Sequence, residues 1–365
     1  MSPIHADISR YGIPFTVPVM VRGLPVERRE GLLLGLRTPD GGATAFGEIA
    51  PLPGLHDESL EEAERSLGGI ISTIPDLIDG PIDTLHQLIE HVSLPPSVAT
   101  GVEMAVLNFR ASLAGTLPPL PATLRPARRI AVNALLAGTP ETVLARAETG
   151  YAAGFRTFKL KVQSGRIDEA IASVRAFHES FGEKSELRLD ANQSLTLDEA
   201  IGFGCSIPGG SVTYIEEPVQ DAALIPLFHE RTGILSALDE TLWQKPELLA
   251  EIPTEALGAL ILKPNRLGGI LKSLDLAALA GRMGLEAVFS SAFESGVSLG
   301  MYALMASLTS TEPPASGLDT ISYLDHDLLD IPFATPGGSV DPVEAWQNSQ
   351  QVDNTLLKPV SSWIL

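Results

Sequence analysis

The sequence predicts an α/β fold: a (β/α)8-type, TIM-like barrel with an N-terminal α+β capping domain. Three observations support this prediction. Short apolar stretches alternate with amphipathic helical stretches over residues 126–325, which is about the length that such a barrel needs. Residues 1–125 instead combine a β-hairpin pattern with helices. Polar residues also follow the barrel strands at regular intervals, and this fold carries its active sites at those strand ends.

The N-terminal region favours antiparallel strands followed by helices. Residues 31–38 and 43–50 are rich in apolar side chains, and the Pro-Asp-Gly-Gly sequence between them is a strong turn signal. A Pro-rich segment, residues 115–129, marks the end of this region. Between the hairpin and that segment, the helical spacing of apolar residues predicts helices within 56–72, 81–92 and 96–114.

The barrel region contains eight candidate strands. They are residues 129–136, 157–162, 187–192, 213–218, 235–240, 259–265, 286–291 and 316–322. An open, doubly wound sheet is the alternative, but no glycine-rich phosphate-binding motif follows the first of these strands. Residues 326–365 carry no motif that indicates a function, and we expect them to pack back on the capping domain.

The composition excludes several classes of protein. The chain has 365 residues, a formal net charge of −20 and one cysteine, Cys205, so it can form no intrachain disulfide and would repel nucleic acids and anionic membranes. No apolar run approaches the roughly 18 to 20 residues of a membrane span, and the N-terminus lacks the features of a secretory signal. We therefore expect a cytoplasmic protein without a nucleic-acid or membrane partner; the small-molecule carboxylate that we expect as its substrate follows from the strand-end residues and the resemblance described below. The sequence leaves the oligomeric state undetermined.

Six polar residues follow barrel strands at intervals of 23 to 29 residues, which is the length of one strand and helix unit. They are Lys161, Asp190, Glu216, Asp239, Lys263 and Ser290. The C-terminal ends of the strands converge on one mouth of a barrel, so these side chains are expected to meet there. Burying so many polar groups requires that they pair with one another or bind an ion.

The three acids come from consecutive strands and suggest a metal site. An all-oxygen set of Asp190, Glu216 and Asp239 suits a hard divalent cation, and Mg²⁺ is the natural choice because it keeps positions open for water and substrate oxygens. Lysines on the preceding and following strands would flank the ion. Such a site suits proton abstraction next to a carboxylate. Lys161 would be the base, and Lys159, on the same face of the strand, would meet the substrate or the acids.

Several motifs resemble those of the enolase superfamily, and within it those of the muconate-lactonizing-enzyme subgroup. The sequences KLK, DAN, EEP, DE and KPN are similar to its Lys-x-Lys motif, its three ligand-bearing strands and its second lysine. The resemblance implies a barrel with a capping domain, and Glu217 and Glu240 would face away from the ligands. It assigns five functional residues: Asp190, Glu216 and Asp239 as Mg²⁺ ligands, and Lys161 and Lys263 as catalytic lysines.

Two further stretches, residues 47–63 and 289–300, resemble the o-succinylbenzoate synthase family. That resemblance implies the dehydration of 2-succinyl-6-hydroxy-2,4-cyclohexadiene-1-carboxylate to o-succinylbenzoate, a step of menaquinone or phylloquinone synthesis. Lys161 would remove the proton next to the ring carboxylate and return it to the departing hydroxyl, while Lys263 would stabilise the anionic intermediate. The capping loop, residues 47–57, would close over the substrate and exclude water. The substrate contacts would include Leu52, Lys159, Ser290 and Ser291.

Two other functions stay open. The first is an N-succinylamino acid racemase, which would use the same metal and lysines, or another enzyme of the muconate-lactonizing-enzyme subgroup. The second is a non-catalytic binding module on the same fold. The last candidate strand, 316–322, lacks the Asp-x-Asp motif that resembles dipeptide epimerases, which disfavours that activity. Among nearby residues we expect His56 at the surface, Arg188 as an interior partner of buried acids, and Glu294 as a hydrogen-bond acceptor or a helix N-terminal residue.

Overall fold

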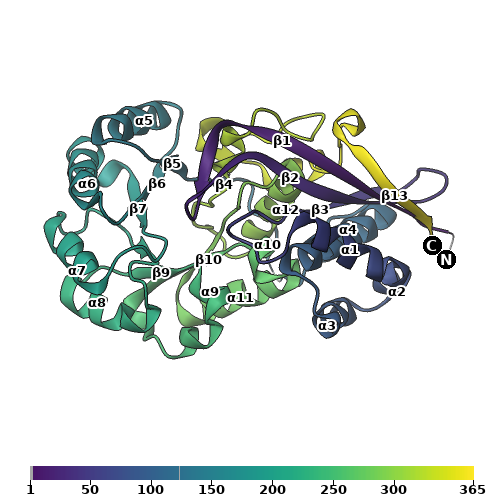
Figure 1. Cartoon of the computed structure of the whole chain (residues 1–365), viewed down its shortest axis with the longest axis horizontal. Helices are drawn as coiled ribbons and strands as arrows, with labels where there is room; N and C mark the ends of the chain where they lie inside the picture. Colours follow the sequence, from purple (N-terminus) through teal and green to yellow (C-terminus); the bar gives the residue numbers. More distant parts are fainter. Residues whose placement is uncertain (1–2, 123) are drawn as a thin grey trace.

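The computed structural model describes residues 3–122 and 124–365, which contain two large sheets of different kinds (Figure 1). The first sheet is antiparallel, with the order β13-β1-β2-β3. The predicted hairpin is confirmed as β2 and β3. Because β13 pairs with β1, the two ends of the chain lie together (Figure 1). The strands are β1 His5–Val21, β2 Leu24–Arg37, β3 Thr44–Ile49 and β13 Lys358–Ile364.

Four helices follow the hairpin, and one of them, α2, was not predicted. They are α1 Leu60–Ile70, α2 Ile74–Asp79, α3 Ile82–Val92 and α4 Pro96–Ala114. A capping box between Ser59 and Glu62 starts α1. Helix α4 is buried along most of its length because it packs between β3 and the barrel region. A Cβ atom at Gly47 would lie only 1.9 Å from the carbonyl oxygen of Gly101, so glycine at position 47 allows this close approach.

The second sheet is parallel and has seven strands in chain order from β5 to β11. Its strands are β5 Ala134–Leu136, β6 Thr157–Lys161, β7 Glu186–Asp190, β8 Ile215–Glu216, β9 Ser236–Leu238, β10 Leu257–Leu262 and β11 Glu286–Phe289. Longer helices connect them: α5 Pro140–Ala152, α6 Ile167–Phe181, α7 Leu197–Ser206, α8 Ile225–Thr232 and α11 Ile270–Met283. Helix α12, Gly296–Ala306, follows the last strand. Figure 1 shows α5 to α8 on the outer side of the sheet. The mixed α/β architecture with a parallel sheet is therefore confirmed.

The predicted eighth strand, residues 316–322, is not a strand. Ser316 forms an isolated bridge to Val132, and Gly317 forms one to Ser290, after which the chain turns into a 3-10 helix at Asp319–Tyr323. The seven-stranded sheet is therefore not closed by an eighth strand, and the expectation of a complete eight-stranded barrel was wrong. Ser316 and Gly317 bridge the two sheet edges. A Cβ atom at Gly317 would lie 2.4 Å from the Ser290 hydroxyl, so a larger residue there would force that hydroxyl to rotate away.

The remaining elements complete the outer layers. Strand β4, Ile130–Ala131, pairs with β12, Ser339–Val340, and α13, Pro342–Asn348, packs against α12. Within the described residues, no helix is long and apolar enough to cross a membrane. The proposed domain limits at residues 125 and 325 stay predictions.

The N-terminal end of the parallel sheet is sealed by an ion-pair cluster. Arg188 is buried and pairs with Glu186 at 3.1 Å and with Glu286 at 3.4 Å. Its Nη1 also donates to the carbonyl oxygen of Ala315 at 2.7 Å. Glu186 and Glu286 each begin a strand, so this arginine lies toward the end of the sheet opposite to the predicted site. Arg188 is an interior residue as expected, but its acid partners are not buried, so that part of the expectation was wrong.

Candidate active site

The parallel strands bring the predicted acids and lysines to one end of the sheet. Lys161 and Asp190 end their strands and are register partners, and Asp190 is in turn the partner of Glu216. Asp239 follows β9 directly, and Lys263 follows β10. The acids therefore come from three neighbouring strands, and the lysines come from the strands on either side of them.

Lys159 lies among the acids. Its Nζ atom is 2.8 Å from Asp190 Oδ2 and 2.7 Å from Glu216 Oε2. Burial alone would lower the pKa of Lys159, but the charges of Asp190 and Glu216 outweigh burial and raise this pKa well above its usual value. Lys159 is therefore a permanent cation that partly neutralises the acid cluster.

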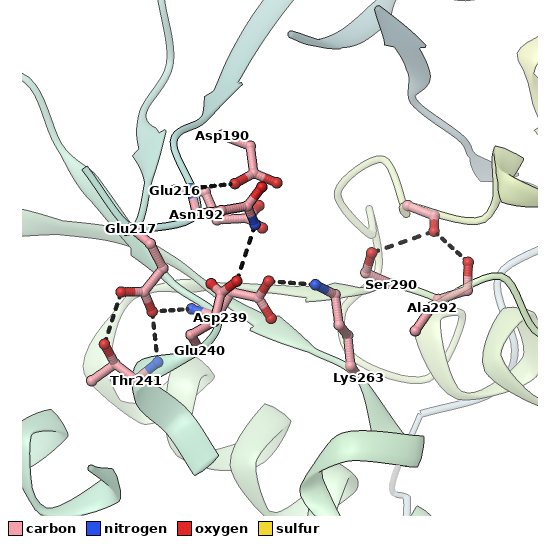
Figure 2. A network of polar contacts seen from close by, with 12 residues as sticks. Asp190, Asn192, Glu216, Glu217, Asp239, Glu240, Thr241, Lys263, Ser290 and Ala292 are labelled. Carbon is pink, nitrogen blue, oxygen red and sulfur yellow. Dashed lines mark hydrogen bonds and ion pairs between the residues drawn. The ribbon is translucent and has the colours of Figure 1, made fainter. Parts of the chain in front are cut away.

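Lys161 is held at the edge of the same cluster. Its Nζ donates to Asp190 Oδ2 and to Asn192 Oδ1, both at 2.6 Å. The amide of Asn192 also donates to Glu240 Oε1 at 3.0 Å, which fixes the orientation of the amide (Figure 2). The Lys161 side chain keeps 33% of its surface exposed, so a substrate can reach its ammonium group.

Asn192 contacts Lys161 in the candidate site but was not predicted as a site residue, although it belongs to the DAN motif. It adopts a left-handed backbone conformation with φ of 43°, and Gln193 has φ of 57°. Asparagine tolerates this region better than most residues. The position of Asn192 two residues after Asp190, at a strand end, was the available signal, but its partners could not be inferred from spacing.

Lys263 approaches from the other side and forms an ion pair with Asp239 (Figure 2). Burial alone would lower the pKa of Lys263, but the charges of Asp239 and Glu216 outweigh burial and raise it. The Nζ atom also lies 5.8 Å from the centroid of the Trp243 ring, within the range of a cation–π contact. This lysine is more enclosed than Lys161, with 12% of its side chain exposed.

Three lysines pair with the three acids, and the pKa values of the acids shift in different directions. Burial alone would raise the pKa of Asp190, but the charges of Lys159 and Lys161 outweigh burial and hold this pKa well below its usual value. Asp190, Glu216 and Asp239 are all buried. Burial and the nearby charge of Asp190 raise the pKa of Glu216, and burial together with Glu240 raises the pKa of Asp239. Asp239 Oδ1 has no hydrogen-bond partner. Such a cluster favours the binding of a cation.

The acids do not already form a metal cage. In the part of the chain that the structure describes, no three acidic, histidine or cysteine side chains are arranged to hold an ion as they stand. The oxygens of Asp190 and Glu216 hydrogen bond to Lys159 instead, and Asp239 bonds to Lys263. The assignment of the three acids as ligands therefore stays a prediction.

The side chain of Glu217 points away from the predicted metal ligands, as expected, and bonds to the backbone that follows β9. A left-handed backbone with φ of 45° turns its side chain toward α9, Thr241–Gln244, as Figure 2 shows. Its carboxylate accepts hydrogen bonds from the backbone N–H groups of Asp239 at 2.8 Å and Thr241 at 2.7 Å. Burial and the neighbouring Glu240 raise the pKa of Glu217 to about 7.

The predicted substrate contacts lie on two loops. Ser291 Oγ donates to the carbonyl oxygen of Gly317 at 3.0 Å and contacts Thr320 Oγ1 at 2.7 Å, while Ser290 Oγ is 3.4 Å from the same carbonyl. Leu52 is buried in the capping loop. No ligand tests these three contacts, so their roles stay predictions.

His56 is buried, so the expectation of a surface histidine was wrong. Its Nδ1 accepts from the N–H of Leu52 at 3.0 Å, and its Nε2 donates to the carbonyl oxygen of Asn265 at 3.1 Å. Burial and the charges of Arg266 and Arg29 lower its pKa to about 3, so the imidazole is neutral. Its partner Asn265 lies 209 residues away in the chain, so no local signal in the sequence indicated this burial.

Two family models match the chain. Residues 142–345 match the family described as "Enolase C-terminal domain-like", and residues 4–109 match "MenC, N-terminal domain". Together with the parallel sheet and the lysines on either side of three strand-end acids, these matches define a member of the enolase superfamily.

Curated relatives specify the family further. The o-succinylbenzoate synthase of Yersinia enterocolitica is 32% identical over 334 residues, which cover 89% of this chain and 92% of that protein. The Haemophilus influenzae o-succinylbenzoate synthase is 28% identical over 88% of this chain and 92% of that protein. Protein PHYLLO, chloroplastic, of Arabidopsis thaliana is 34% identical over 342 residues. The matched region covers 82% of this chain but only 20% of that longer protein. The chain belongs to the o-succinylbenzoate synthase family.

Solved structures show the same fold at low sequence identity. The L-Ala-D/L-Glu epimerase of Bacillus subtilis has a TM-score of 0.80 at 22% identity and covers 93% of this chain and 96% of its own. A Roseovarius nubinhibens member of the enolase superfamily, complexed with magnesium, has a TM-score of 0.79 at 18% identity, with 100% and 99% covered.

Proposed function

We propose that this protein is an o-succinylbenzoate synthase, which dehydrates 2-succinyl-6-hydroxy-2,4-cyclohexadiene-1-carboxylate in menaquinone or phylloquinone synthesis. The observation that carries the proposal is the pair of lysines, Lys161 and Lys263, on opposite sides of three buried acids. Membership in the synthase family supports the choice of reaction.

A divalent metal ion fits the acid cluster, and Mg²⁺ is our proposal for it. Asp190, Glu216 and Asp239 would hold the ion, because all three are buried oxygen donors and Asp239 Oδ1 has no partner. When bound, the ion would supply positive charge to the substrate carboxylate while that group becomes more negative. The magnesium of the Roseovarius nubinhibens protein is in keeping with this choice.

Lys161 is proposed to move the proton. As a neutral amine, Lys161 would take the proton from the carbon next to the ring carboxylate, and as the resulting ammonium it would deliver that proton to the hydroxyl that leaves from the same face. One C–H bond and one C–O bond break, water departs, and the ring becomes aromatic. The exposure of Lys161 allows substrate to reach it, and the contacts with Asp190 and Asn192 hold its Nζ atom in place.

Lys263 is proposed to remain a cation throughout the reaction. Its raised pKa and its ion pair with Asp239 keep it protonated. From the flank opposite Lys161, its charge would stabilise the anion that forms when the proton is removed. Leu52, Lys159, Ser290 and Ser291 would contact the substrate.

The test uses purified protein with the cyclohexadiene substrate and Mg²⁺. We expect the aromatic product to form, as followed by ultraviolet absorbance, and we expect a chelator to stop the reaction until Mg²⁺ is restored. N-succinyl amino acids are assayed in parallel by loss of optical activity. Racemisation without dehydration would replace the proposal with the racemase, and thermal stabilisation by Mg²⁺ without any turnover would favour a binding module.

A further inference from the structure

The turn that follows Lys263 is bonded to the N-terminal region of the chain. This turn is the short helix α10, Pro264–Leu267, and the backbone N–H groups of Arg266 and Leu267 donate to the carbonyl oxygen of Lys263 at 2.8 and 2.9 Å. Any shift of α10 therefore moves the backbone of Lys263. What holds α10 in place also positions this lysine.

Asn265, the second residue of α10, links three segments through one buried side chain. Its Nδ2 donates to the carbonyl oxygen of Ala50 at 2.8 Å and to Glu294 Oε1 at 2.9 Å. Its own carbonyl oxygen accepts from His56 Nε2 at 3.1 Å. Ala50 and His56 delimit the part of the capping loop that we call the latch segment, residues 50–56. Glu294 lies in the loop that carries the two predicted serines.

The latch segment is itself held by buried groups. Arg29 is fully buried and donates to the carbonyl oxygens of Ala50 and Pro51 and, at 3.1 Å, to that of Phe293. The N–H of Leu52 donates to the neutral ring of His56 at 3.0 Å. Leu52 is thus connected to Asn265 through a single imidazole. Because these bonds are shielded from water, they resist opening more than surface bonds do.

A second contact from the N-terminal region reaches the same turn. Thr100, on α4, donates its hydroxyl hydrogen to the carbonyl oxygen of Pro264 at 2.7 Å. Pro264 and Asn265 are therefore both bonded to the N-terminal region, one by a helix and one by the latch segment.

We propose that Asn265 is a positioning residue, which holds Lys263 and the latch segment in one fixed arrangement. This inference rests on the proposed function for the role of Lys263. An amide suits this place because it donates two hydrogen bonds without adding charge beside the buried Glu294. The latch segment would then keep one position with and without substrate. The sequence instead leads us to expect a loop that closes over the substrate.

The first arm of the test compares two buried asparagines. Asn265→Ala removes both donated bonds at the turn. Asn108→Ala is the matched control, because Asn108 is equally buried and bonds to Phe46 and Trp346, and none of its bonds goes to a site residue. We expect Asn265→Ala to lower kcat by about ten- to hundredfold with less change in KM. Asn108→Ala should lower Tm while kcat stays within about twofold.

The second arm does not need turnover. Hydrogen exchange of the free protein should become faster in the latch segment and at the N–H groups of Arg266 and Leu267 in Asn265→Ala, and should not change there in Asn108→Ala. Thr100→Val, which keeps the side-chain shape, should give a smaller increase at the same turn.

The outcomes separate the two proposals. Unchanged exchange in both Asn265→Ala and Thr100→Val would overturn the latch, and so would faster exchange with an unchanged kcat. If the wild-type protein does not dehydrate the substrate, the proposed function fails, and the exchange arm alone then decides whether Asn265 holds the turn to the latch segment.

Discussion

Lys161 and Lys263 flank the same three acids, but their surroundings differ. Lys161 leaves a third of its side chain exposed and is held by Asp190 and Asn192, both from the parallel sheet and its loops. Lys263 is largely enclosed, pairs with Asp239, and lies near the Trp243 ring. The difference suggests that the two lysines have different roles. The accessible amine suits proton transfer, and the enclosed one suits a permanent charge.

The two flanks also differ in what supports them. Asn192 and Glu240 support the Lys161 flank from within the barrel region. The turn after Lys263 is instead bonded to the capping loop and to α4. A change in the N-terminal region should therefore disturb Lys263 first.

The largest expected effect comes from removing the accessible lysine. Lys161→Ala should lower kcat by at least about a hundredfold, because general acid–base catalysis typically contributes 10²- to 10⁴-fold. The circular dichroism spectrum and Tm should stay close to wild type. The control is Lys184→Ala at an exposed position, which should keep full activity. A residual rate within tenfold of wild type would contradict the assignment of the base.

The variant Asp239→Asn tests whether the acids that lie between the two lysines bind Mg²⁺. Replacing this buried carboxylate should raise the Mg²⁺ concentration needed for half-maximal activity at least about tenfold, because the amide is a weaker ligand for a hard cation. Calorimetric titration with Mg²⁺ provides a check without turnover. The exposed Asp168→Asn should bind as wild type does. An unchanged Mg²⁺ requirement in Asp239→Asn would place the ion elsewhere.

The variant His56→Gln tests whether the imidazole that bonds to the turn after Lys263 is buried and neutral, through the pH dependence of the free energy of unfolding. The folded pKa of His56 is about 3 and its ordinary value is 6.5, so only the unfolded chain is protonated between these values. Stability should therefore fall as the pH drops below about 6.5, by about 2 kcal/mol at pH 5 from this group.

The variant lacks this titration. Urea unfolding at pH 7 and pH 5 should show that the stability difference between wild type and His56→Gln shrinks by about 2 kcal/mol on acidification. Parallel pH curves for wild type and His56→Gln would refute the buried, neutral imidazole.

The smallest expected effect concerns the ring beside the enclosed lysine. Trp243→Leu removes the aromatic face 5.8 Å from Lys263 Nζ. Since such contacts contribute about 0.5–2 kcal/mol, kcat should fall by roughly two- to thirtyfold, with KM for Mg²⁺ unchanged. A loss as large as that of Lys161→Ala would mean that the charge of Lys263 depends on Trp243 far more than we infer.

Much of the site was predictable because it depends on local order. Lys161, Asp190 and Lys263 end or follow strands whose apolar pattern is plain in the sequence, and parallel strands place such ends together. The eighth strand was not predictable in the same way. Residues 316–322 have an acceptable strand pattern, but only two of them fit between the sheet edges before the chain turns.

By itself, the sequence determined the alternation of strands and helices, the turns, and the types of residue at the strand ends, because these follow from short-range periodicity and turn chemistry. Only the tertiary structure decided which polar groups meet across the chain, such as His56 with Asn265, 209 residues apart. Those pairings arise because buried donors and acceptors must find partners in the packed interior. No spacing along the chain encodes that requirement.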